Sequence, residues 1–177
     1  KICKNVGFPV REPMLASGKV QAITGFSFSS YINLTSKGVS EDDISLMLMA
    51  DYGLKLYGNA VIVNTDFATA KPNVVKTFLS TTIKGMKEMI ADPASTIPYV
   101  LKYNKIAKAK TETTRLKMAI RDNIVTDAVK ANGLGSVDMI RLNESIKQLS
   151  ETYNFKTKMD GSMVFDDSYL PDSYKRK

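Results

Sequence analysis

The chain has 177 residues and a formal net charge of +7, with 44% hydrophobic and 24% charged residues. This composition is typical of a globular protein of one large or two small domains, and no apolar stretch approaches the roughly 20 residues of a membrane-spanning helix. The single cysteine, Cys3, excludes an internal disulfide, and the lack of histidine excludes Ser–His and Cys–His nucleophile pairs and histidine metal sites in this stretch.

The charged residues indicate a solvated surface. Basic residues are spread along the chain and gather at its end, in residues 175–177. They do not cluster with aromatic residues as in a nucleic-acid platform, so we expect no nucleic-acid partner. Three consecutive carboxylates at residues 41–43 are typical of a solvated turn, and we expect no metal site there.

The first 24 residues alternate short apolar segments with turn signals. Residues 2–8 place apolar side chains among polar ones, which predicts a strand. A short helix is predicted over residues 10–17 with Gly18 as its C-terminal stop, and a second strand over residues 20–24. Strand–helix–strand alternation predicts a parallel α/β sheet.

The segment Gly25–Phe26–Ser27 follows the second predicted strand. Ser27 can cap a helix predicted over residues 28–36, which ends at Gly38. Gly25 and the free amides at this helix start would then form a small polar cradle for an anion or a carbonyl. Alternatively, Ser27 only caps the helix and Gly25 only makes the turn.

Residues 44–67 are the most informative stretch. An apolar run over residues 44–50, a polar and aromatic segment, and a second apolar run over residues 60–63 predict strand, loop and strand. Asn64–Thr65–Asp66 can then cap a helix. The loop would lie at the carboxyl end of a strand, where an open α/β sheet places its ligand crevice.

Two tyrosines and two glycines distinguish this loop. The glycines, Gly53 and Gly58, allow the backbone to approach a ligand closely. The tyrosines, Tyr52 and Tyr57, offer flat faces and a hydroxyl group each. The alternative is an ordinary tight connection whose tyrosines cover the core.

The rest of the chain is predicted to be mostly helical. Pro72 fits the first turn of a helix, and Asp92–Pro93 ends that helix and starts another. A further helix is predicted to end at Asn132–Gly133, and the last covers about residues 138–153. Their methionine and leucine stripes are typical of core rather than of a cofactor site. Residues 155–177 are predicted to be extended chain over a surface, with a frayed basic end.

Four segments together resemble a known family: REPMLASGKVQAITGFSFSSY, DYGLKLYGNAVIVN, KPNVVKTFL and MAIRDNIVT. They are similar to the substrate-binding proteins of ABC importers, in the NMT1/THI5-like group that takes up pyrimidine precursors of thiamine and related heterocycles. The resemblance runs from about Val6 to Pro171. It implies an α/β, periplasmic-binding-protein-like (type II) fold, in which two lobes joined by a hinge trap the ligand.

The resemblance also suggests how the chain is divided. The composition changes from short alternating units to amphipathic helices near Asn59. Residues 1–58 are therefore expected to be the remainder of the second α/β lobe. Residues 59–177 would be the hinge strand and the C-terminal helical part of the first lobe, and the N-terminal half of such a protein would be absent from this chain.

The resemblance implies a ligand site built from two segments. The seven matching positions are Gly25, Phe26, Ser27, Tyr52, Gly53, Tyr57 and Asn59. Aromatic rings can stack on a flat heterocycle, Ser27 with backbone amides can hold a polar substituent, and Asn59 offers both a donor and an acceptor. No residue is expected to be catalytic or to bind a metal.

The leading hypothesis from the resemblance is the solute-binding component of an ABC importer. It would capture a small pyrimidine- or thiamine-precursor-like ligand outside the cytoplasm (in the periplasm of a cell that has one), without chemistry or cofactor. Its partners would be the permease subunits, and it would contact the membrane only through the transporter. The alternative is the pyrimidine synthase of the same group, an enzyme of thiamine biosynthesis whose cysteine-rich motif and histidine would lie in the absent half. A third hypothesis is an interaction domain with an inactive cleft.

Overall fold

The structure is a computed structural model that describes residue 3 and residues 5–177, so the predicted strand position Ile2 lies outside the described residues. Regular structure within residues 5–177 consists only of helices, α1 to α10 and four short 3-10 or π segments. No helix among the described residues has both the length and the apolar character needed to cross a bilayer.

The predicted α/β two-lobed fold is wrong. The described residues contain no β-strand, and the predicted strands over residues 20–24 and 60–63 are irregular backbone. Residues 44–50 are irregular as far as Leu48 and then enter a 3-10 helix. The predicted strand over residues 2–8 is likewise not formed where the structure describes it.

The reason for this error is that an apolar run predicts burial but supplies no partner strand. A strand exists only where its N–H and C=O groups pair with a neighbour. Residues 58–63 make no backbone hydrogen bond with any described residue, and the side chain of Ile62 is 91% exposed. This segment therefore has the apolar composition of a strand but no partner to pair with among the described residues.

The chain separates into two compact units, which we describe one at a time. The first contains residues up to Leu48 together with Pro93–Asn123, and the second contains Met49–Asp92 together with Ile124–Lys177. The expected lobes, residues 1–58 and 59–177, stay a prediction.

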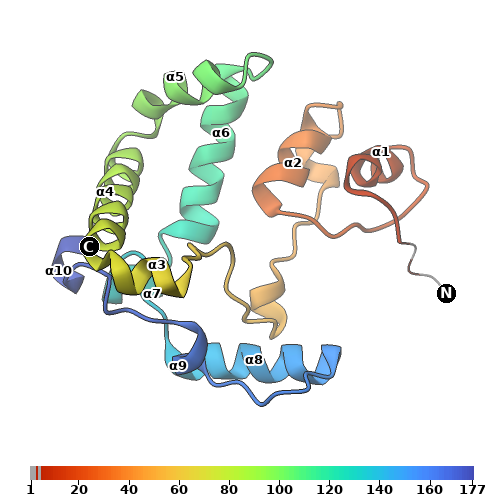
Figure 1. The fold of residues 1–177 in the computed structure, drawn as a ribbon. Helices are drawn as coiled ribbons and strands as arrows, with labels where there is room; N and C mark the ends of the chain where they lie inside the picture. The colour runs from red at the N-terminus through yellow and green to blue at the C-terminus, as the bar shows by residue number, and fades with distance from the viewer. Residues whose placement is uncertain (1–2, 4) are drawn as a thin grey trace. The chain divides into compact units, whose positions relative to one another are not determined.

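Helix α2 lies at the centre of the first unit. It packs against α1 on one side and against α6 on the other, and α5 packs on α6 (Figure 1). The buried core side chains come from α2, α5 and α6 and are Ile32, Leu34, Ile97 and Met118. The elements of this unit are η1 (Phe8–Val10), α1 (Arg11–Ala16), α2 (Ser27–Thr35), η2 (Glu41–Asp43), α5 (Pro93–Tyr103) and α6 (Ala109–Ala119), which continues into the π-helical η4 (Ile120–Ile124).

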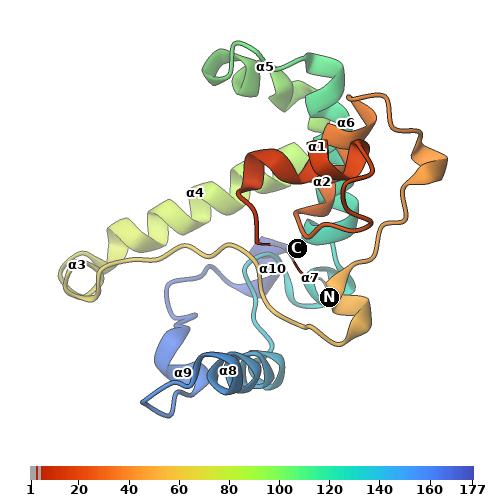
Figure 2. The ribbon, with the colours of Figure 1, turned by 90° about the vertical axis from the view of Figure 1, so that its right-hand side faces the viewer.

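The second unit is built on two longer helices, α4 and α8. Helix α3 packs on α4, α10 contacts α4, and α9 lies against α8 (Figure 2). Its buried apolar side chains are Ala68, Val75, Ile83 and Leu134. The elements are η3 (Met49–Tyr52), α3 (Thr65–Ala70), α4 (Pro72–Ala91), α7 (Asp127–Asn132), α8 (Met139–Tyr153), α9 (Gly161–Val164) and α10 (Ser173–Arg176).

Most predicted helix ends are confirmed, because capping is a local interaction. The Asn64 side chain accepts a hydrogen bond from the Phe67 N–H (3.0 Å), and Pro72 occupies the first turn of α4. The Asp138 carboxylate caps α8, and α7 ends at Asn132 with Gly133 as its C-cap residue, whose φ of 86° suits glycine.

The predicted frayed C-terminus is wrong. The last residues form α10, and the Arg176 guanidinium donates hydrogen bonds to the carbonyls of Leu134 (3.0 Å) and Pro171 (2.7 Å). The Leu134 N–H donates in return to the Arg176 carbonyl (3.0 Å). These three bonds hold the basic end against the loop that follows α7.

Candidate functional site

The first unit contains a pocket at the junction of α1, α2 and the segment between them. That segment is fixed by Arg11, whose Nη1 donates to the Thr24 carbonyl (2.8 Å). The Arg11 guanidinium also lies 4.0 Å from the centroid of the Phe8 ring, a cation–π contact. One arginine therefore holds both the start of the unit and the segment that leads into α2.

A second polar contact ties α2 directly to α1. Ser30 donates a hydrogen bond to the Glu12 carboxylate (Oγ to Oε1, 2.8 Å), and the pair is partly buried. Gly25 lies against this contact, because a Cβ on residue 25 would collide with the Ser30 Oγ and lie 3.3 Å from its Cβ. Glycine therefore leaves the space that the bond between Ser30 and Glu12 occupies, and its backbone angle is not unusual.

The other side of α2 is held by α6. The Arg115 guanidinium donates to the Phe28 carbonyl (3.1 Å) and to the Glu112 carboxylate (3.1 Å). Ser27 donates to the Asn123 side-chain carbonyl, a long bond of 3.4 Å. The first turn of α2 is thus held by α6 through Arg115 and by η4 through Asn123.

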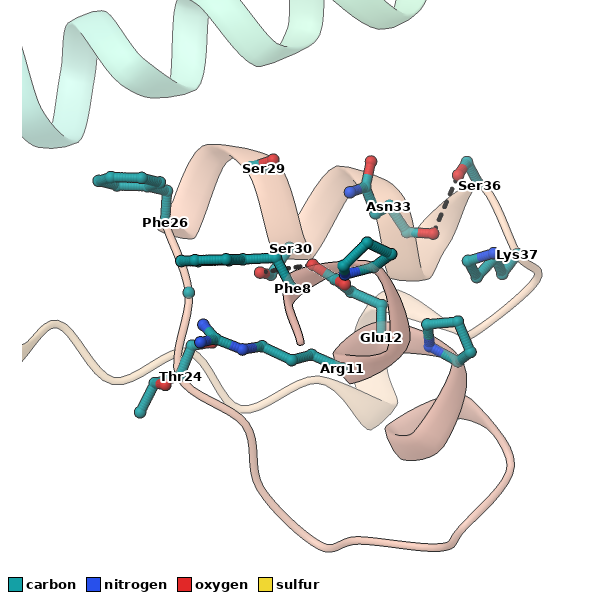
Figure 3. Close-up of a pocket in the computed structure, with 13 residues that line it drawn as sticks. Phe8, Arg11, Glu12, Thr24, Phe26, Ser29, Ser30, Asn33, Ser36 and Lys37 are labelled. Atoms are coloured by element: carbon teal, nitrogen blue, oxygen red, sulfur yellow. Dashed lines mark hydrogen bonds between the residues drawn. The ribbon is translucent and has the colours of Figure 1, made fainter. Parts of the chain in front are cut away.

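The pocket has a volume of about 500 Å3 and an apolar wall beside a polar one. Figure 3 shows the Phe8 ring between the Phe26 ring and the Arg11 guanidinium, with Ser30 facing Glu12. The 13 lining residues are Phe8, Pro9, Arg11, Glu12, Pro13, Thr24, Gly25, Phe26, Ser29, Ser30, Asn33, Ser36 and Lys37.

The polar groups of the pocket favour a ligand that carries hydrogen-bond acceptors. Arg11 uses one of its N–H groups in the bond to Thr24, so its other donors remain available. The side chains of Ser29 and Asn33 make no hydrogen bond with the described residues. Arg11 and Lys37 outweigh Glu12 by one positive charge, which favours a neutral or anionic ligand.

Two of the sequence-predicted ligand residues line this pocket. Gly25 and Phe26 lie at its rim beside the start of α2, and the Phe26 ring is stacked on Phe28 with centroids 5.6 Å apart. The predicted cap by Ser27 is wrong, because α2 begins at Ser27 and Phe26 is its N-cap residue without a side-chain cap. Whether Gly25, Phe26 and Ser27 bind ligand stays a prediction.

The other predicted ligand residues belong to the second unit. Tyr52 ends η3 and is 69% exposed, Gly53 has a φ of 92°, and Asn59 is exposed. Tyr57 packs on α8, where its hydroxyl accepts a hydrogen bond from the Asp138 N–H (2.9 Å). The role of these four residues in ligand binding stays a prediction.

Helix α8 fixes the backbone of residues 52–59, which we call the tyrosine loop. Arg141 donates to the carbonyls of Lys55 (2.8 Å) and Leu56 (3.0 Å), and Ser145 also donates to Lys55 (3.1 Å). Gln148 donates to the Gly53 carbonyl (3.3 Å). The loop is therefore ordered by side chains one helix turn apart on α8.

Sequence reasoning missed most of the pocket. Phe8, Arg11 and Glu12 were assigned only to a predicted strand and helix, and the lining positions of α2 were not identified. The available signal was the spacing of Ser29, Asn33 and Ser36, which recur on one face of a helix directly after Gly25.

Comparison with known proteins gave one family. A family model described as NMT1/THI5 like matches residues 2–96. Neither the curated proteins nor the solved structures gave a match. The matched residues include all 13 residues that line the pocket. They also include the tyrosine loop.

Proposed function

The chain belongs to the NMT1/THI5-like family, and from this we propose that it binds a small heterocyclic molecule as the solute-binding component of an ABC importer. The ligand would be a pyrimidine or a related thiamine-precursor-like compound. The protein would act outside the cytoplasm and deliver the compound to the permease subunits. We propose binding without chemistry.

The observation that supports this proposal is the composition of the pocket in the first unit. Its volume of about 500 Å3 lies within the range of small-molecule sites. The rings of Phe8 and Phe26 can contact the flat face of a heterocycle, and Arg11, Ser29 and Asn33 can hydrogen-bond its nitrogen and oxygen substituents. The aromatic wall would hold the plane of such a ring, and the donors on the polar wall would fix its rotation within that plane.

Thermal unfolding with a panel of compounds tests this proposal. Aminopyrimidines and their phosphates come first, followed by other heterocycles and sulfonates. A ligand at 100 times its dissociation constant should stabilise the folded chain by about 2.7 kcal/mol. For a chain of this size the melting temperature should rise by a few degrees. No stabilisation by any compound of a broad panel would contradict the proposal.

Substitutions in the pocket locate the binding. Phe26→Ala and Phe8→Ala should each weaken binding roughly fivefold, since an aromatic contact contributes about 1 kcal/mol. Tyr153→Ala is the matched control, because Tyr153 and Phe8 are both 70% exposed and Tyr153 lies at the end of α8 in the second unit. An equal loss of affinity in Tyr153→Ala would show that the ligand does not bind specifically in the pocket.

The fate of the ligand separates transport from synthesis. A binding protein returns its ligand unchanged, whereas the pyrimidine synthase of the same group would convert or consume a substrate. The stabilising compound should therefore be recovered intact after prolonged incubation with the protein, as measured by mass spectrometry. Turnover would assign the chain to the enzyme branch instead.

A further inference from the structure

The turn between α5 and α6 carries an exposed apolar and basic surface that the pocket does not use. We define the α5–α6 tip as residues 99–110, which include the end of α5, the connecting turn and the start of α6 (Figure 1). Tyr99, Tyr103 and Ile106 are 70%, 85% and 91% exposed. Ile106 is as exposed as any large apolar side chain described in the chain.

These side chains do not belong to the core of the first unit. The core face of α5 is provided by Ile97, which is 4% exposed and therefore buried. Tyr99 and Tyr103 lie four residues apart on one face of α5, and Ile106 follows in the turn between α5 and α6. A group of large exposed side chains outside the core of its own unit is typical of a binding surface.

The charge of the tip is uniform in sign. Residues 93–111 contain four lysines and no acidic residue, and all four lysines are exposed. None of the four forms an ion pair with the described residues. Lys108 is the N-cap residue of α6 and Lys110 lies in its first turn, where the helix dipole disfavours a cation. Glu112 also lies in this turn, but its carboxylate pairs with Arg115 and with none of the four lysines. An anionic partner would relieve this repulsion.

We propose that the α5–α6 tip docks on an anionic lipid surface. Tyrosine rings prefer the headgroup level of a bilayer, and lysines can extend their apolar stems along it while their charges meet lipid phosphates. Ile106 would enter the boundary between headgroups and acyl chains. A single-stranded nucleic acid would use the lysines and tyrosines but not this isoleucine. The contact would be direct, in addition to the contact through permease subunits in the proposed function.

Binding to vesicles measures the proposed contact. The whole chain should co-sediment with vesicles of phosphatidylcholine mixed with phosphatidylglycerol, and not with phosphatidylcholine alone. High salt should weaken the binding, because it screens the lysines. If the chain does not bind the anionic vesicles at low salt, the proposal is wrong.

A charge-matched pair of variants locates the contact. The tip variant replaces all four lysines by glutamine: Lys102→Gln, Lys105→Gln, Lys108→Gln and Lys110→Gln. It should lose vesicle affinity by at least about tenfold. The control variant removes four exposed lysines elsewhere: Lys19→Gln, Lys71→Gln, Lys156→Gln and Lys158→Gln. An equal loss in both variants would show that only net charge matters and would overturn the proposal.

A fluorescent reporter tests insertion without removing charge. The chain contains no tryptophan, so Tyr103→Trp introduces a single one at the tip. Its emission should shift to shorter wavelength on anionic vesicles, whereas that of Tyr153→Trp, at the end of α8, should not. A labelled oligonucleotide provides the last comparison. Binding of the oligonucleotide in preference to vesicles, lost in the tip variant, would identify a nucleic-acid surface and refute the lipid contact.

Discussion

The hydroxyl of Tyr57 accepts a hydrogen bond from the N–H of Asp138, the residue that caps α8 (2.9 Å). The guanidinium of Arg141, one turn into that helix, lies 4.3 Å from the centroid of the Tyr57 ring. The same guanidinium holds the carbonyls of Lys55 and Leu56. Tyr57 therefore anchors its loop on the first turn of α8, and this structural role does not depend on ligand binding.

Replacing Tyr57 should measurably destabilise the second unit. Tyr57→Phe removes one hydrogen bond and should lower the free energy of unfolding by about 1 kcal/mol. Tyr57→Ala also removes the contact with Arg141 and should cost about 1 kcal/mol more. Urea unfolding followed by circular dichroism measures both.

Tyr52→Ala is the control for these variants. Tyr52 is 69% exposed and its side chain forms no hydrogen bond with the described residues, so its replacement should change stability by less than about 0.5 kcal/mol. Equal losses for Tyr52→Ala and Tyr57→Ala would refute the anchoring role. Because Tyr57→Phe keeps the ring, it also distinguishes this role from stacking on a ligand.

Helix ends were predictable from the sequence because their determinants lie within a few residues. The caps at Asn64 and Asp138 and the stop at Gly133 each depend on one side chain or one backbone angle. Strands were not predictable in the same way. The apolar run at residues 60–63 has the composition of a buried strand, but pairing depends on residues distant in sequence.

The candidate site was predictable only in part, for the same reason. Gly25 was identified because a glycine followed by a helix start is a local pattern, whereas Phe26 came only from the resemblance to the family. Arg11 reaches the pocket through its bond to Thr24, 13 residues away, which no local pattern indicates. The bond of Tyr57 to Asp138 spans 81 residues and could not be predicted either.

Gly25→Ala should destabilise the first unit through Ser30. The added methyl group collides with the Ser30 Oγ, which can only avoid it by rotating away from Glu12. The expected cost is the hydrogen bond to a carboxylate, about 1.5–3 kcal/mol. Gly58→Ala is the control, because a Cβ on residue 58 meets nothing within 4 Å.

A double-mutant cycle tests this explanation. In a Ser30→Ala background the collision with the Oγ and the bond to Glu12 are both absent, so Gly25→Ala should cost clearly less than in the wild type. The measurement is the difference in unfolding free energy between the two backgrounds. If Gly25→Ala costs the same in both, its effect does not pass through Ser30.

Two further glycines should respond to alanine with opposite signs. Gly85 lies inside α4, where a Cβ meets nothing within 4 Å, so Gly85→Ala should stabilise the chain by about 0.5–1 kcal/mol. Gly133 has a φ of 86°, and a Cβ there would lie 2.8 Å from the Arg176 Cβ and 3.0 Å from the Ser173 carbonyl oxygen. Gly133→Ala should therefore cost about 1–3 kcal/mol. Thermal unfolding of both variants tests this pair, and a stabilised Gly133→Ala would contradict the docking of α10.

The Asp160 carboxylate caps α9 and should titrate below its ordinary range. It accepts hydrogen bonds from the Ser162 hydroxyl (2.7 Å) and the Ser162 N–H (2.9 Å), which together lower the pKa of Asp160 from its usual 3.8. The hydroxyl is the larger cause, so Ser162→Ala should move the pKa of Asp160 part of the way back up. Carbon-13 NMR titration of the aspartate carboxyl carbons measures both values.

The direction of this pKa shift fixes its effect on stability. Because the pKa of Asp160 is lower in the folded chain, the cap stabilises the fold at pH values above the unfolded pKa and is lost as the pH falls through the folded pKa. Asp160→Asn keeps a capping oxygen but cannot titrate. The stability advantage of the wild type over Asp160→Asn should therefore be largest at neutral pH and disappear in acid below the folded pKa. A difference between the two proteins that does not change from neutral to acid pH would show that the charge of Asp160 does not contribute to the cap.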